Sequence, residues 1–134
     1  MKVCRIEKDT VFRKVGEVIT ASKKEHNYSE GRAKAESMLE NVRKQDYPES
    51  YGRGNSLFVF PYDDKKEERA FKWASTYAPT PGSSCIVNLL VLEVDNVEWH
   101  DSRNYEDLCF LLGNYKVGMR DKNVNEDDLC NRYW

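Results

Sequence analysis

The sequence lacks an apolar run long enough to cross a membrane: its longest covers residues 86–94, and a span needs about 20 residues. It also shows no secretory signal, because only Val3 and Cys4 separate Lys2 from Arg5. We therefore expect a cytoplasmic protein of bacterial or phage origin that makes no membrane contact.

Several motifs of well-known enzyme classes are missing as well. The sequence contains no P-loop, GxGxxG, HExxH or GxSxG motif, which removes the strongest signs of kinases, dehydrogenases, zinc proteases and α/β hydrolases. Its 4 cysteines are widely spaced without a CxxC pair, so we predict no metal site. Lys and Arg number 21 against 23 Asp and Glu, and this balance gives no strong indication of nucleic-acid binding.

What the sequence does contain is typical of a globular protein. Of its 134 residues, 40% are hydrophobic and 33% are charged, a balance found in folded rather than disordered chains. The length predicts a single domain covering residues 1–134. It says nothing about the oligomeric state.

Strands and helices are predicted in a mixed order. Apolar alternation predicts a strand at residues 2–7, and a second strand is predicted at residues 56–60. The apolar run 86–94 predicts a central strand buried on both faces, with residues 97–100 as its hairpin partner. Helices are expected behind four capping residues, and the absence of regular βαβ alternation favours the α+β class. The expected caps are Asn27, Asp64, Asn104 and Asn123.

A polar, glycine-containing segment leads into the second predicted strand. Arg53, Gly54, Asn55 and Ser56 directly precede the apolar residues 57–60. Glycine lets a backbone approach a ligand closely, and arginine binds anions, so this segment suits a phosphate-bearing ligand. Ser56 could instead hydrogen-bond its own turn.

Arg5 and Phe58 each allow two interpretations. An arginine inside a short first strand either pairs with a surface carboxylate or holds a diphosphate with two donors. Phe58 either packs in the core or stacks on a ligand ring. His100 stands beside Asp101, but adjacent strand residues point to opposite faces, which argues against a joint acid–base role.

Taken together, these segments resemble a bacterial family of ADP-ribosyltransferase-like proteins. Cys4-Arg5-Ile6 is similar to the first strand of that fold, and the segment from Arg53 to Phe60 resembles its second strand, with the pattern R-x-x-S-x-F. The other matching segments are the helix around Trp73, the run Ile86–Val94 with Val97-Glu98-Trp99, and Asn131-Arg132-Tyr133-Trp134.

The resemblance implies a small mixed or antiparallel split sheet flanked by three to four short helices. It implies a mono-ADP-ribosyltransferase that uses NAD as substrate and modifies a macromolecular target, expected to be a protein. Arg5 and Ser56 would then be catalytic. The residues expected to bind NAD are Arg5, Arg53, Asn55, Ser56 and Phe58.

The family pattern also includes a strand after the Tyr-Trp pair, and this strand carries the catalytic glutamate. The sequence ends at Trp134. Either Glu98, Asp101 or Glu106 replaces that glutamate, or the chain is a non-catalytic module. Such a module would bind a nucleotide or a protein, for example as a phage or mobile-element inhibitor of a host system.

Overall fold

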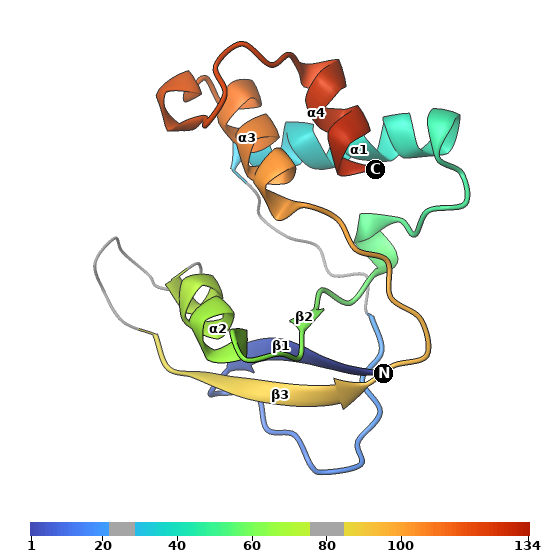
Figure 1. The fold of residues 1–134 in the computed structure, drawn as a ribbon, viewed down its shortest axis with the longest axis vertical. Helices are drawn as coiled ribbons and strands as arrows, with labels where there is room; N and C mark the ends of the chain where they lie inside the picture. The colour runs from blue at the N-terminus through green and yellow to red at the C-terminus, as the bar shows by residue number, and fades with distance from the viewer. Residues whose placement is uncertain (22–28, 76–84) are drawn as a thin grey trace. The chain divides into compact units, whose positions relative to one another are not determined.

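The computed structural model describes residues 1–21, 29–75 and 85–134, which form an α+β arrangement of three strands and four α-helices. The chain divides into two compact units, and Figure 1 shows the elements of each. Unit 1 comprises residues 1–20 and 57–97, and unit 2 comprises residues 21–56 and 98–134. A single domain over the whole chain stays a prediction.

Unit 1 contains a small antiparallel sheet with the strand order β2-β1-β3. Strand β1 spans Lys2–Lys8, β2 spans Phe60–Pro61 and β3 spans Val87–Glu93. The predicted first strand is confirmed. The predicted second strand is wrong over most of its length, because only its last residue, Phe60, pairs with β1.

The central strand is β1, where the sequence had suggested residues 86–94. Val3 and Cys4 of β1 are fully buried, whereas Ile86 and Val91 are 72% and 52% exposed. The prediction of a central, most buried strand at 86–94 is therefore wrong. A continuous apolar run indicates apolar cover on both faces, but it does not determine which strands lie on either side.

One face of the sheet packs against helix α2, which spans Lys66–Ala74. Cys4 and Ile6 project from this face of β1 and form a core with Phe60 and Ala70. The ring of Trp73 meets that of Phe60 edge-on, with 5.2 Å between their centroids. The alternation of β1 thus places Cys4 and Ile6 against the helix.

Unit 2 is helical and has its own core. Helices α1 (Glu30–Asp46), α3 (Ser102–Leu112) and α4 (Glu126–Tyr133) pack around Leu39, Leu108 and Leu129. A Cβ added at Gly31 of α1 would lie 2.4 Å from the carbonyl oxygen of Cys109, so glycine permits the close approach of α1 and α3. Two short 3₁₀ turns, η1 (Arg53–Asn55) and η3 (Lys116–Gly118), complete this unit.

Four helices are confirmed, but their first residues differ from the sequence prediction. Neighbouring polar residues compete for the N-cap, and tertiary packing selects among them. Asp101 and Asn125 cap α3 and α4, each through a side-chain oxygen that accepts a backbone N–H bond of 2.9 Å. Asp101 and Asn125 thus take the places predicted for Asn104 and Asn123, and Lys65 rather than Asp64 precedes α2. Ser29 precedes α1, and the predicted cap Asn27 lies outside the described residues.

Residues 97–100 form no strand, so the predicted hairpin partner of β3 is wrong. The side chains of Glu98 and His100 instead bond to each other and to residues of unit 2. Within the described ranges, no helix is both long and apolar enough to pass through a membrane.

Candidate functional site

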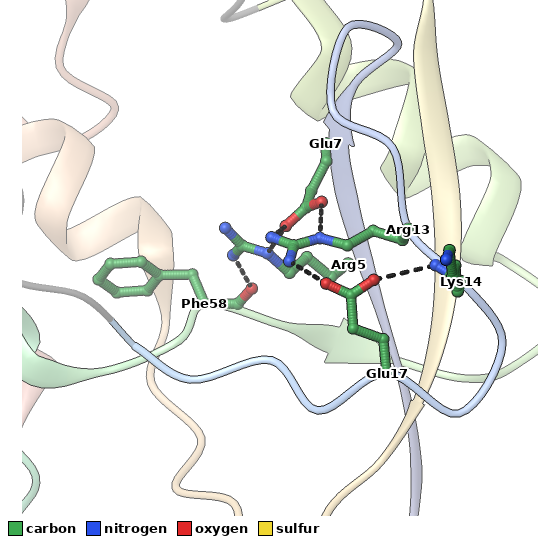
Figure 2. Close-up of polar contacts among 6 residues, drawn as sticks. All are labelled: Arg5, Glu7, Arg13, Lys14, Glu17 and Phe58. Atoms are coloured by element: carbon green, nitrogen blue, oxygen red, sulfur yellow. Dashed lines mark hydrogen bonds and ion pairs between the residues drawn. The ribbon is translucent and has the colours of Figure 1, made fainter.

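Arg5 lies in the middle of β1, on the sheet face opposite Cys4 and Ile6 (Figure 2). Its Nε donates to Glu7 Oε1 at 3.2 Å, and its Nη1 donates to the carbonyl oxygen of Phe58 at 2.9 Å. Its Nη2 makes no hydrogen bond within the described part of the chain, and the side chain is 23% exposed. Arg5 is thus anchored at two donors and keeps one open donor group.

Glu7 follows Arg5 on the same face and is a site residue that the sequence analysis missed. It is only 7% exposed, and Arg13 donates to its carboxylate from Nε at 2.9 Å and from Nη2 at 3.2 Å. The hydrogen bonds from Arg13, helped by Arg5 and opposed by burial, hold the pKa of Glu7 below its ordinary value. The spacing of two residues in a strand could have indicated this pair.

The segment 9–20 returns across this face and is fixed there by ion pairs (Figure 2). Arg13 Nη1 donates to Glu17 Oε1 at 2.9 Å, and the backbone N–H of Lys14 donates to Glu17 Oε2 at 2.9 Å. These bonds, led by the Lys14 backbone, lower the pKa of Glu17. Gly16 adopts a φ of +84°, which favours glycine in this turn.

The apolar side chains of the same segment face solvent. Phe12, Val15 and Val18 have exposed fractions of 84% or more. This distribution is the reverse of an ordinary loop, because the charged residues bond inward and the apolar residues point outward. Such exposed apolar groups are typical of a binding surface.

Arg53 belongs to unit 2 and is enclosed there. Its Nε and Nη2 donate to the two carboxylate oxygens of Glu36, each at 3.0 Å, and its guanidinium lies 4.0 Å from the ring centre of Tyr105. Nη1 bonds to the hydroxyl of Tyr133, and the side chain is only 13% exposed. Burial opposes the charge, but the bonds with Glu36 outweigh it and raise the pKa of Arg53.

Two of the five predicted NAD-binding residues lie together in unit 1, namely Arg5 and Phe58. The other three, Arg53, Asn55 and Ser56, lie in or next to the turn η1 of unit 2. The hydroxyl of Ser56 donates to the carbonyl oxygen of Gly52 at 2.8 Å. Ser56 therefore bonds its own turn, as one of its two sequence interpretations expected.

The three carboxylates proposed as substitutes for a catalytic glutamate each have partners. Glu98 accepts bonds from the backbone N–H of Tyr51 at 3.0 Å and from His100 Nε2 at 2.8 Å. Burial opposes ionisation of Glu98, but the Tyr51 bond and His100 lower its pKa. The other two, Asp101 and Glu106, pair with Arg103 and Arg120 at 2.6 and 3.6 Å.

His100 is held on both ring nitrogens, a feature that the sequence did not reveal. Its Nδ1 lies 2.6 Å from the carbonyl oxygen of Tyr133, which can only accept, so this nitrogen donates. The imidazole stacks on the Tyr133 ring with 4.7 Å between centroids. His100 therefore fixes the end of α4, and its carboxylate partner is Glu98 rather than Asp101.

Comparison of the chain with protein-family models, with curated proteins and with solved structures gives no match. In the described residues, no group of three or more His, Cys, Asp or Glu side chains is placed to hold a metal ion. Arg5, Glu7 and their neighbours therefore form the candidate site.

Proposed function

We propose that the chain is an ADP-ribosyltransferase-like protein that binds NAD at Arg5 and transfers ADP-ribose to a macromolecular target, a protein. The observation that carries this proposal is the geometry of Arg5. Two of its donors are anchored by Glu7 and the Phe58 carbonyl, and Nη2 remains open to an anionic ligand. A fixed guanidinium with an open donor is suited to a diphosphate.

Glu7 supplies the carboxylate that such a transfer requires. When the bond between nicotinamide and ribose breaks, positive charge develops on the sugar, and a nearby carboxylate stabilises it. The lowered pKa of Glu7 keeps that group ionised at neutral pH. Arg13 also binds Glu7, so catalysis requires Arg13 to release part of this carboxylate when the substrate binds.

Phe58, from the segment that precedes β2, completes the proposed site. Phe58 holds Arg5 through its carbonyl oxygen. Ser56 belongs to unit 2 and bonds its own turn, so it is left out of the proposed NAD contacts. Arg53 is left out of the proposed NAD contacts because Glu36 and Tyr133 already accept its bonds. A cytoplasmic location is part of the same proposal.

Calorimetric titration with NAD, followed by a chromatographic assay of released nicotinamide, tests this function. We expect the unmodified chain to bind NAD and Arg5→Ala to bind it far more weakly. Arg69→Ala is the matched control, since Arg69 is a similarly exposed arginine of the same unit that pairs with Asp63. Absence of NAD binding at millimolar ligand would overturn the proposal.

The exposed loop favours a second candidate, a non-catalytic module that binds a protein. Its supporting observation is the outward position of Phe12, Val15 and Val18 on a segment fixed by Arg13 and Glu17. An apolar pocket on a partner protein would cover these side chains. Hydrogen exchange of residues 11–19 should then be slower in bacterial extract than in buffer for the unmodified chain, but not for Phe12→Ser. Equal exchange in both chains would count against this candidate.

A further inference from the structure

We propose that β3 pairs with β3 of a second copy of this chain, in an antiparallel two-fold arrangement centred on Leu90. The inference rests on the sheet edge and not on the proposed NAD site. Strand β3 pairs with β1 on one side only, and in the part of the chain that the structure describes no strand pairs with its other side. Figure 1 shows β3 at the edge of the sheet.

The hydrogen-bond register identifies the open backbone groups. Met1 and Val94 exchange both of their backbone bonds, at 3.0 and 3.1 Å, and Asp9 donates to Ile86 at 3.3 Å. Because bonding alternates along an antiparallel strand, the even-numbered residues of β3 bond to β1 and the odd-numbered residues bond outward. The outward N–H and C=O groups belong to Val87, Leu89, Val91 and Glu93.

This edge lacks the features that normally prevent edge-to-edge pairing. Exposed edge strands are usually short, bulged, or interrupted by lysine or proline. Strand β2, at the opposite edge, has only two residues and includes Pro61. Strand β3 has seven residues, VNLLVLE, without lysine, arginine, proline or glycine, and its Val91 is 52% exposed.

The sequence of β3 is complementary to itself in one register. Centring on Leu90 pairs all seven residues of β3 with the seven of the second copy, and each outward-bonding residue then meets another outward-bonding residue. Leu89 faces Val91, and Glu93 faces Val87 rather than a second Glu93. A parallel arrangement would bring the two Glu93 carboxylates together, so charge also favours the antiparallel pairing.

Measurement of the molar mass by light scattering over a concentration series is the first test. We expect the mass to rise toward twice the chain mass of 15.7 kDa. Val91→Lys should return the mass to that of one chain, because it places an ammonium group on the pairing edge. Val117→Lys is the matched control, since Val117 is an 80% exposed valine outside β3 and its replacement should leave the dimer intact.

Cysteine crosslinking tests the register. In the proposed pairing Leu90 faces its own copy across a pair without hydrogen bonds, with about 4.5 Å between Cα atoms, which suits a disulfide. Leu90→Cys should therefore crosslink to itself. Asn88→Cys and Leu92→Cys should crosslink when mixed, but neither should crosslink alone, and peptide mapping separates these bonds from any made by native cysteines. A monomeric mass at millimolar chain, or a dimer unchanged by Val91→Lys, would overturn the proposal.

Discussion

The two units each contain an arginine that the sequence assigned to NAD, and the two arginines differ in what surrounds them. Arg53 of unit 2 bonds both oxygens of Glu36 and lies against the ring of Tyr105. Arg5 of unit 1 makes one bond to Glu7 and one to a backbone carbonyl, and among the described residues its Nη2 has no hydrogen-bond acceptor. An arginine with every donor used stabilises a fold, whereas one with an open donor can bind a ligand.

The largest effect is expected from Arg53→Ala. Its removal leaves the largely buried carboxylate of Glu36 without its ion-pair partner, which costs about 3–5 kcal/mol in the free energy of unfolding. Urea unfolding followed by tryptophan fluorescence measures this loss. The control is Arg103→Ala, an exposed pair with Asp101 whose removal should change little. If Arg53→Ala unfolds like the unmodified chain, the comparison fails.

Arg5→Ala should have its main effect on binding. Loss of a charge-assisted contact to the diphosphate should weaken NAD binding about 10- to 100-fold, since such bonds contribute about 1.5–3 kcal/mol. The urea midpoint should fall much less than for Arg53→Ala, because Arg13 still holds Glu7. Calorimetry and urea unfolding on the same samples separate the two roles. If Arg5→Ala instead lowered the stability strongly and left the NAD affinity unchanged, Arg5 would be a structural and not a binding residue.

Tyr105→Phe sharpens the comparison within unit 2. The change removes the hydroxyl that donates to Glu36 Oε1 at 2.9 Å and accepts a long bond from Arg32 Nε at 3.5 Å, but it keeps the ring against Arg53. Loss of one hydrogen bond should lower the unfolding free energy by about 1 kcal/mol. Urea unfolding measures it, and Tyr115→Phe, at an exposed tyrosine, should show no change. A loss as large as that of Arg53→Ala would assign the stability to the hydroxyl rather than to the ion pair.

The smallest expected effect is that acid pH weakens the ion pairs that hold the segment 9–20 on the sheet. The pKa of Glu7 is below the ordinary value of about 4.3, so its contribution is fully present above that pH and disappears as pH falls through the lower folded value. Arg5, Arg13 and Glu17 are the charged groups around it, and Glu17 titrates in the same direction. Proteolysis within residues 11–19 should therefore quicken at acid pH.

A protease that is active from acid to neutral pH makes that measurement, and Glu7→Gln serves as the comparison. The variant should already be cleaved quickly at neutral pH and should respond less to acid. Equal cleavage rates for both chains at neutral pH would show that the ion pairs do not hold the segment.

The sequence alone determined the first strand, the existence of the four helices and the α+β class. Alternation is a local property, and in β1 it puts Cys4 and Ile6 on one face of the strand. Helical periodicity is local too, and it puts Leu39 and Leu108 on the core side of their helices. The sequence also placed an arginine within the first strand, and a bond from Ser56 to its own turn was one of the two interpretations that it allowed.

Only the tertiary structure decided the strand order and the partners of the charged groups. Local composition cannot tell a central strand from an edge strand, because that distinction depends on which distant segments meet. The apolar run 86–94 was therefore predicted to be central, although the central strand is β1. The partners of Arg53 lie 17 and 80 residues away in the chain, at Glu36 and Tyr133. No spacing rule connects such residues, because only the packing of the helices brings them together. This packing encloses Arg53, whereas Arg5 lies outside it.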